Sequence, residues 1–397
     1  MVRRNRDSRR VAVVGASTSG LFSATRMARE GLEVHLLERS SRLELSPRAL
    51  IVTERVRRLL SDLDLHPSGH TVDSYQLVAG AVAANINLLR PDLIIERSHL
   101  IGQLADRARA AGVSIHLGRR VIGIEPAPGG MRLYTRGDGG SEEAHAAIVI
   151  GADGARSTVA QAVGADSRPT VPVLQALVHL PPQLSSRTVR VWFRPQDTRF
   201  FYWLIPDSPR TAVVGLVADG TRAPRVLLDE FLEEIGLEPM SYQAGSVPIR
   251  RSWAPLGRRV GEGHVYLVGD AAGHVKVSTV GGLVTGFEGA FAISEVVLGR
   301  PPRTQLRRLR AELWLHRMIR DILDSFDERD YVRLLGLIPG RVDRILASRS
   351  RDDVVRLTAI LCAAQPRLAG FAWRRVSRRR VGNGLVLDPV ADEQGGR

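Results

Sequence analysis

Residues 11–39 constrain the fold more than any other stretch, because they place a glycine-bounded turn between two short apolar runs. Val11 to Val14 form a run suited to a buried parallel strand, and the turn from Gly15 to Gly20 opens a segment with helical spacing. A second apolar run, Val34 to Leu37, ends in Glu38. A strand, a turn, a helix, a second strand and an acid about twenty residues after the turn form a dinucleotide-binding βαβ unit.

Each position of the turn, which reads GASTSG, has a chemical reason. Gly15 lets the chain leave the strand tightly, Gly20 lets the helix pack closely on the sheet, and the free N–H groups of the helix start face a pyrophosphate. Glu38 can accept a hydrogen bond from a ribose hydroxyl. Ser17 replaces the middle glycine of G-x-G-x-x-G, and its hydroxyl could donate to the phosphate. An ordinary βαβ crossover is the alternative for this stretch alone. We expect the nucleotide to lie against Gly15, Ser17, Thr18, Ser19, Gly20, Glu38 and Arg39.

The composition narrows the class of protein. The chain has 397 residues and a formal net charge of +14, a balance that could suit nucleic acid, an anionic membrane or an acidic substrate. Lys276 is the only lysine, so the charge reflects a general preference for arginine, and without a nucleic-acid-reading motif we expect no nucleic-acid partner. Cys362 is the only cysteine, which excludes a disulfide within one chain and favours a reducing cytoplasm. We also find no metal-ligand spacing, and no apolar run of the roughly twenty residues that span a bilayer.

Two kinds of segment alternate along the chain. Buried-strand runs recur at Ala147–Ile150 and Val265–Val268, strand patterns fill the stretches between them, and helical spacing dominates after Pro301. We therefore predict an α/β fold: a discontinuous Rossmann-type domain, an inserted antiparallel-sheet substrate domain and a helical C-terminal region. The predicted bounds are 9–72, 97–168 and 255–300 for the first, 73–96 and 169–254 for the second, and 301–397 for the third.

Several local elements are specific enough to test. Thr53 and Ser98 are expected to be N-caps of two amphipathic helices. Two strands, Val121–Glu125 and Met131–Thr135, are expected to form a hairpin around a Pro-Gly-Gly turn.

Three separated stretches together resemble the FAD-dependent oxidoreductases related to p-hydroxybenzoate hydroxylase. The first is the turn with Glu38. The second, Gly151–Ser157, resembles the Asp-Gly motif of that superfamily, and the third, Gly269–Gly282 (GDAAGHVKVSTVGG), is similar to its Gly-Asp motif, whose acid contacts FAD hydroxyls. The resemblance implies FAD as cofactor and NAD(P)H or another reductant as electron donor. It assigns to the cofactor site Arg48, Arg97, Asp153, Gly269, Asp270, Gly281 and Gly282.

A narrower resemblance is to the geranylgeranyl reductase family. The Gly-Asp loop keeps that family's lysine, but Val277 stands where proline is usual and Val280 where a third glycine is usual. The stretch 201–206 (FYWLIP), followed by Gly215, is similar to the family's aromatic signature. A cysteine that many of these reductases carry has no counterpart near 46–48. The aromatic stretch also resembles flavin-dependent halogenases, but the lysine which those enzymes need on a strand of the first half is missing, so halogenation is disfavoured.

His274 and Lys276 are the candidate catalytic residues, because they are titratable groups inside the Gly-Asp loop. Lys276 could add positive charge near the flavin or be a solvated loop lysine. His274 could donate a proton to a substrate carbanion or simply bond the backbone. A helix expected to begin near Gly281 would point its positive end at the flavin and stabilise the anionic reduced form.

Aromatic residues 200–203 are the candidate wall of a substrate pocket. Strand alternation sends Phe201 and Trp203 to one face and Tyr202 to the other, although plain sheet core is the alternative. We expect Phe201 and Trp203 to contact an apolar small molecule. The basic tail Phe371–Arg380 could lie on an anionic membrane surface or pack on the body of the protein.

Three functions remain open on this reading. The first is FAD-dependent reduction of carbon-carbon double bonds in a polyprenyl or other apolar substrate, as the geranylgeranyl reductase resemblance implies. The second is a flavin-dependent monooxygenase that hydroxylates or epoxidises an apolar molecule, which uses the same fold. The third is a non-catalytic binding module that has lost the cofactor. We expect a cytoplasmic protein, with peripheral membrane contact as an open question.

Overall fold

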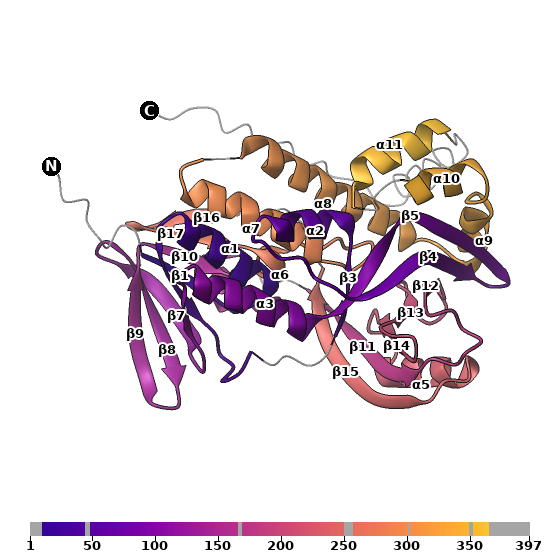
Figure 1. Cartoon of the computed structure of the whole chain (residues 1–397), viewed down its shortest axis with the longest axis horizontal. Helices are drawn as coiled ribbons and strands as arrows, with labels where there is room; N and C mark the ends of the chain where they lie inside the picture. The colour runs from indigo at the N-terminus through magenta and orange to yellow at the C-terminus, as the bar shows by residue number, and fades with distance from the viewer. Residues whose placement is uncertain are drawn as a thin grey trace.

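The structure of the chain is a computed structural model, which describes residues 10–43, 48–165, 169–249, 257–300, 302–348 and 352–364. Figure 1 shows two large sheets beside one another, a smaller sheet at one end, which has three strands, and a layer of C-terminal helices along one side. This arrangement confirms the predicted α/β class with a Rossmann-type sheet, a second, mostly antiparallel sheet and a helical C-terminal region.

A six-stranded sheet carries the first motif, in the order β16-β17-β10-β1-β2-β6. Its strands pair in parallel except for β16, which pairs antiparallel with β17 at the edge. Central parallel strands are covered on both faces, which explains why they appear in the sequence as unbroken apolar runs. The strands are β1 Arg10–Val14, β2 Glu33–Leu37, β6 Ser114–His116, β10 Ile148–Gly151, β16 Gly257–Val260 and β17 Gly263–Leu267.

Alternate residues of β1 face two different cores. Val11 and Val13 pack with the helices α1 Thr18–Arg29, α3 Arg97–Ala110 and α7 Leu283–Val297. Ala12 and Val14 pack on the opposite face, against a three-stranded sheet and α4. That second layer consists of β7 Arg120–Ala127, β8 Gly130–Gly137, β9 Gly140–Ala146 and α4 Thr158–Ala162.

An eight-stranded sheet forms the other half of the molecule, in the order β15-β11-β14-β13-β12-β4-β5-β3. Its pairs are antiparallel except for β12 with β4. Helix α5 Pro224–Glu234 packs on one face through Leu227, Leu228 and Phe231. The strands are β3 Ala49–Val52, β4 His70–Ala79, β5 Val82–Glu96, β11 Thr170–His179, β12 Thr188–Trp192, β13 Tyr202–Pro206, β14 Thr211–Val217 and β15 Pro239–Pro248.

Helices α8 Arg303–Leu323 and α9 Glu328–Gly336 of the C-terminal region pack on different halves of the molecule. Helix α9 packs on β4 and β5, with Tyr331 and Leu335 in their shared core. Helix α8 packs against α7 and α11, which brings the C-terminal region next to the six-stranded sheet. The remaining helices of the described chain are α2 Glu54–Ser61, α6 Gly269–Ala272, α10 Arg341–Ser348 and α11 Val354–Ala364. Among the described residues, we find no helix that combines the length and apolar character needed to cross a membrane.

The local predictions had different outcomes. Thr53 caps α2, where its side chain accepts a hydrogen bond from Val56 N, as predicted. The prediction for Ser98 was wrong: β5 runs directly into α3, Glu96 occupies the N-cap without a side-chain cap, and the Ser98 hydroxyl donates to the Glu96 carboxylate. The hairpin is confirmed as β7 and β8, but β9, a polar edge strand, escaped prediction. Residues 46–47 and the tail 371–380 lie outside the described residues.

Candidate functional site

The first turn touches both of the other glycine-containing motifs. Gly15 has a φ of +102°, and a Cβ added to it would lie 2.6 Å from the carbonyl oxygen of Ala152 and 3.0 Å from Cα of Asp153. On the other side, the Ser19 hydroxyl lies 2.9 Å from where a Cβ on Gly269 would be. Three segments far apart in the sequence therefore meet at the start of α1.

The start of α1 retains the hydrogen-bonding groups of a phosphate site. Ser17 is the N-cap, and its side chain accepts a 3.1 Å hydrogen bond from Gly20 N, so the serine that replaces the expected glycine acts as a helix cap. The Glu38 carboxylate accepts from Ala16 N at 2.7 Å and from Ser40 N at 2.9 Å. Thr18 begins the helix, Ser19 is buried, and Arg39 is exposed. The nucleotide role of these residues remains a prediction.

Two predicted cofactor arginines lie near Asp270. The Arg97 backbone N–H donates to the Arg48 carbonyl oxygen at 2.9 Å, which brings the two backbones together where β5 continues into α3. Burial lowers the pKa of the Arg48 guanidinium below its ordinary value, although the charge of Asp270 acts in the opposite direction. Burial also lowers the pKa of Arg97, as does the charge of Arg48, while Asp270 and Glu38 oppose them. The charge of Asp270 thus acts on the pKa values of both arginines, and the charge of Glu38 acts on the pKa of Arg97.

Asp153 faces its own chain. Its carboxylate accepts from the Ser157 hydroxyl at 2.5 Å and from Val159 N at 3.2 Å, at the start of α4. Burial raises the pKa of Asp153 above its ordinary value, although these hydrogen bonds act in the opposite direction. The structure therefore gives Asp153 a role in fixing the Asp-Gly turn, and direct contact with a cofactor remains a prediction.

The Gly-Asp loop brings Asp270 to the start of α7. Gly282 is the N-cap of α7, and a Cβ added to it would lie 3.2 Å from Oδ1 of Asp270 and 3.3 Å from the carbonyl oxygen of His274. Gly281 precedes it with no backbone crowding. The open backbone N–H groups of a helix N-terminus therefore lie beside a carboxylate, with no side chain on the two glycines to fill the space.

Val280 has a conformation that explains the glycine expected at this position. Its φ is +55°, in the left-handed region, where a β-branched residue is strained by about 1–2 kcal/mol. The loop imposes this conformation because Val280 N and Thr279 N both donate to the Lys276 carbonyl oxygen, at 2.7 and 2.9 Å.

We predict that Val280→Gly is more stable than Val280→Ala by about 1 kcal/mol, because both changes remove the valine contacts but only glycine relieves the strain. Urea unfolding of the two variants measures the difference. Val332, in the middle of α9, is the matched control. There alanine should be more stable than glycine by about 1 kcal/mol, and the same order at both positions would contradict the prediction.

The aromatic stretch divides between two faces as predicted. Tyr202 packs under α5, with its ring centroid 4.4 Å from that of Phe231. Trp203 and Phe201 pack on the opposite face, with their ring centroids 6.0 Å apart. They belong to an apolar cluster that also contains Val280 of the Gly-Asp loop. The Trp203 indole N–H is buried and has no hydrogen-bond partner among the described residues. The sheet face that carries Phe201 and Trp203 therefore contacts the Gly-Asp loop, and the Trp203 indole N–H is a buried donor that no described residue uses.

Gly215 makes room for that indole. A Cβ on Gly215 would lie 2.5 Å from Cζ2 of Trp203 and 2.7 Å from Cβ of Gln175. The glycine and the tryptophan of the aromatic signature are thus required together, a reason that the spacing alone did not reveal.

His274 is completely buried, and its ring packs directly against Gly289 of α7. Its carbonyl oxygen accepts from the Thr285 hydroxyl at 2.6 Å. This packing fixes the loop on α7, and a ring closed off from solvent is poorly placed to exchange protons with a substrate. We therefore assign no catalytic step to His274.

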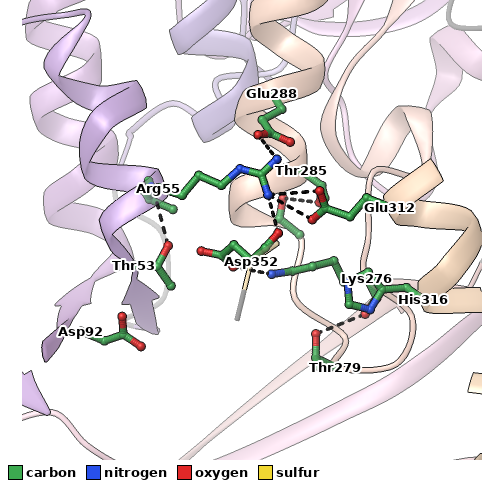
Figure 2. A network of polar contacts seen from close by, with 12 residues as sticks. Thr53, Arg55, Asp92, Lys276, Thr279, Thr285, Glu288, Glu312, His316 and Asp352 are labelled. Atoms are coloured by element: carbon green, nitrogen blue, oxygen red, sulfur yellow. Dashed lines mark hydrogen bonds and ion pairs between the residues drawn. The ribbon is translucent and has the colours of Figure 1, made fainter. Parts of the chain in front are cut away.

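Lys276 belongs to a buried network of charges (Figure 2). Its ammonium lies 2.8 Å from Oδ1 of Asp352, whose side chain is 1% exposed. Arg55 of α2 contacts the carboxylates of Glu288 and Glu312 and donates to the carbonyl oxygen of Asp352. The solvated-lysine interpretation of Lys276 is therefore wrong, because the side chain is buried among opposite charges.

Sequence reasoning missed the partners of Lys276. One signal was available: Glu312 and His316 lie four residues apart on α8, on the same face as the buried Leu309. Polar residues on an apolar helix face indicate a buried polar cluster. His316 Nδ1 lies 2.6 Å from the Ser278 hydroxyl, and its Nε2 has no partner among the described residues.

Burial shifts the pKa values of two groups of the network strongly, upward for Glu312 and downward for His316. Burial raises the pKa of Glu312 from 4.5 to about 7, with Arg55 opposing. Its contribution to stability is therefore complete below about pH 4.5 and is lost as the pH rises through about 7. Burial lowers the pKa of His316 from 6.5 to about 3, so its contribution is present above about pH 6.5 and is lost as the pH falls toward 3.

Comparison of Glu312→Gln with the parent protein isolates the first of these effects. We predict that the free energy of unfolding of the variant, relative to the parent, rises by about 3 kcal/mol between pH 4.5 and 8, because the variant has no carboxylate to ionise. Urea unfolding at a series of pH values measures this difference. Glu30→Gln is the control, since hydrogen bonding from Arg300 lowers the pKa of that exposed group. A pH-independent difference for Glu312→Gln would contradict the prediction.

Comparison with known proteins places this site in a family. The chain matches the FAD-binding domain family over residues 8–297. It is 28% identical to digeranylgeranylglycerophospholipid reductase 2 of Methanothermobacter thermautotrophicus, covering 87% of this chain and 95% of that protein. It is 27% identical to the rifampicin monooxygenase of Streptomyces venezuelae, covering 95% and 87%. The solved structure of a geranylgeranyl bacteriochlorophyll reductase-like protein from Thermoplasma acidophilum has the same fold, with a TM-score of 0.75 at 16% identity, covering 92% and 98%.

The chain belongs to the FAD-binding domain family. It is an FAD-dependent oxidoreductase, which sets aside the non-catalytic binding module. The described residues fit the cofactor: the turn at Gly15 leaves no space for a Cβ, and backbone N–H groups lie at the starts of α1 and α7. Two surface hollows, one between α5 and β15 and one on α9, contain none of the site residues. Among the described residues, no cluster of three or more His, Cys, Asp or Glu side chains could hold a metal ion.

Proposed function

We propose that this oxidoreductase reduces carbon-carbon double bonds of a polyprenyl or similarly apolar substrate. The observation that carries the proposal is the contact between the aromatic wall and the Gly-Asp loop: Trp203 and Phe201 share one apolar cluster with Val280. An apolar chain lying on this wall would be next to the glycines where we place the flavin. The relatives named as reductases of geranylgeranyl lipids support the same substrate class.

Different residues of the chain would bind the cofactor and orient the substrate. The α1 N-terminus and Glu38 would hold the adenosine diphosphate part of FAD, and Asp270 would fix a hydroxyl of the cofactor. When bound, FAD supplies the two-electron chemistry, and the reaction consumes NAD(P)H or another reductant. Gly281 and Gly282 leave space at the α7 N-terminus, whose partial positive charge stabilises negative charge that develops there. Trp203 and Phe201 would orient the substrate and exclude water.

A flavin-dependent monooxygenase is the second candidate function. The similarity to the rifampicin monooxygenase covers nearly the whole chain, and the cysteine of many geranylgeranyl reductases has no counterpart here. Both reactions could use the same apolar wall, so the arrangement of the site is compatible with either.

The mass of the product distinguishes the two reactions. Reduced, FAD-loaded protein is incubated without oxygen with a geranylgeranyl lipid, and the product is weighed by mass spectrometry. We expect a product heavier by two hydrogen atoms for each double bond reduced. Product that forms only in air and is heavier by one oxygen atom would overturn the reductase proposal in favour of the monooxygenase.

The assignment of Asp270 is tested by FAD binding alone. We predict that Asp270→Ala weakens FAD binding at least about tenfold, because hydrogen bonds to a charged group contribute roughly 1.5–3 kcal/mol. Fluorescence titration of the apoprotein with FAD gives the two dissociation constants. Asp106→Ala, which removes an exposed carboxylate of α3, should leave the dissociation constant unchanged. Equal affinity of Asp270→Ala and the parent protein would show that the acid has been placed wrongly.

The substrate class and the charge of the chain bear on where the protein works. We propose a cytoplasmic enzyme that meets its apolar substrate at a membrane surface, since the substrate class is lipid-like and the net charge of +14 favours anionic lipids.

A further inference from the structure

The ion pair of Lys276 and Asp352 connects the Gly-Asp loop to a part of the chain outside the residues that match the FAD-binding domain family. Lys276 is in the Gly-Asp loop, whereas Asp352 stands two residues before the start of α11, beyond the matched residues 8–297. The two side chains are 11% and 1% exposed, so their 2.8 Å contact is almost fully shielded from water. A shielded pair interacts much more strongly than one on the surface.

Both partners are held in place. The Lys276 backbone N–H donates to the Gly281 carbonyl oxygen at 3.0 Å, and the Lys276 carbonyl oxygen accepts from the next turn of the loop. On the other side, the Asp352 carbonyl oxygen accepts a hydrogen bond from Arg55, which also binds Glu312 (Figure 2). The pair therefore has little freedom to rearrange.

The end of the Lys276 side chain lies beside Gly281, which precedes α7. Cε of Lys276 is 3.8 Å from where a Cβ on Gly281 would be. Lys276 is also the only lysine in a chain that otherwise uses arginine for its cations. A narrow ammonium fits between the loop and Asp352, where a planar guanidinium would need more space.

We propose that Asp352, from the C-terminal segment, neutralises the charge of Lys276 beside the bound flavin and so keeps the electron affinity of the flavin below the value that the lysine alone would give it. The inference rests on the proposed placement of the flavin at Gly281 and Gly282. With both charges present, the pair is neutral overall and exerts a small field on the ring. Removing either partner leaves one buried charge beside it, and reduction of the flavin adds negative density that this charge attracts or repels.

Single and double variants of the FAD-loaded protein test the proposal. Asp352→Asn leaves the lysine charge alone and should favour reduced over oxidised FAD about tenfold, which corresponds to a midpoint potential about 30 mV higher for two electrons. Lys276→Met leaves the carboxylate alone and should lower the potential by a similar amount. The double variant has neither charge of the pair, and its midpoint potential should return near that of the parent protein. Potentials are measured anaerobically against a reference dye at pH 8, which lies between the ordinary pKa values of aspartate and lysine.

The pattern of signs separates this role from a structural one. Loss of packing alone would shift both single variants in the same direction or leave the potential unchanged, and either result would overturn the proposal. If a single variant fails to fold, the double variant and the remaining single variant still decide, because only a charge effect restores the parent potential in the double variant. Failure of the parent protein to reduce a geranylgeranyl lipid would count against the proposed function and would leave these potentials unaffected.

Discussion

Gly15→Ala should lose most of its bound FAD and should be less stable than the parent protein by several kcal/mol. Gly15 has a φ of +102°, which alanine adopts only with strain, and the new Cβ would lie 2.6 Å from the carbonyl oxygen of Ala152. That oxygen belongs to the backbone of the neighbouring strand end, so it cannot move aside as a side chain would. The turn must therefore open, and the N–H groups at the start of α1 lose their alignment on the phosphates.

Gly31→Ala is the matched control for this prediction. Gly31 also has a positive φ, +83°, but no atom lies within 4 Å of the Cβ position. It should cost only the local strain, about 1 kcal/mol, and should retain FAD. The FAD content of the purified proteins, from their absorbance, and urea unfolding measure both effects. Full FAD content in Gly15→Ala would show that the turn does not hold the cofactor.

Arg55→Met should reduce the free energy of unfolding by about 3–5 kcal/mol, the cost of removing one partner from a buried ion pair. Arg55 lies between Glu288 and Glu312, and its Nη1 is 3.1 and 3.4 Å from the two oxygens of the Glu312 carboxylate. Methionine keeps most of the apolar volume but leaves these acids without their shared cation. Because burial already raises the pKa of Glu312 to about 7, this carboxylate can escape the penalty by binding a proton at low pH. The loss should therefore be smaller at pH 5 than at pH 8.

Arg58→Met is the control for Arg55→Met on the same helix. Arg58 forms an i,i+4 pair with Glu54, but its side chain is 73% exposed. Exposed pairs contribute roughly 0–1 kcal/mol, so the loss should stay below about 1 kcal/mol at both pH values. Urea unfolding with the same slope for all variants makes the comparison direct. Similar losses for the two arginines would contradict the central position of Arg55 in the network.

The sequence predicted those parts of the fold that follow from local patterns. The apolar runs of β1, β2, β10 and β17 predicted the parallel sheet because strands covered on both faces lack alternation. Alternation likewise placed Trp203 and Tyr202 on opposite faces. The edge strand β9 carries too few apolar residues to show such a pattern, and Ser98 misled because strand β5 continues directly into helix α3.

The spacing of Glu312 and His316 indicated a buried polar cluster, but the partners within it could not be predicted, since they come from five separate parts of the chain. Lys276 and Asp352 are 76 residues apart, and Arg55 and Glu312 are 257 apart. Nothing in the local sequence distinguishes Asp352 from the adjacent Asp353, whose side chain is 37% exposed. The positive φ of Val280 was not predicted, although the family that the sequence resembles usually has glycine at this position, the residue that adopts such a φ most easily.

A crystal structure of the FAD-loaded protein is the most direct test of the account, because it measures where the cofactor lies. We expect electron density for the adenosine diphosphate part along the turn from Gly15 to Gly20. The flavin ring should lie beside Gly281 and Gly282, with Trp203 on the substrate side. Density for FAD away from the meeting point of Gly15, Asp153 and Asp270 would contradict the account.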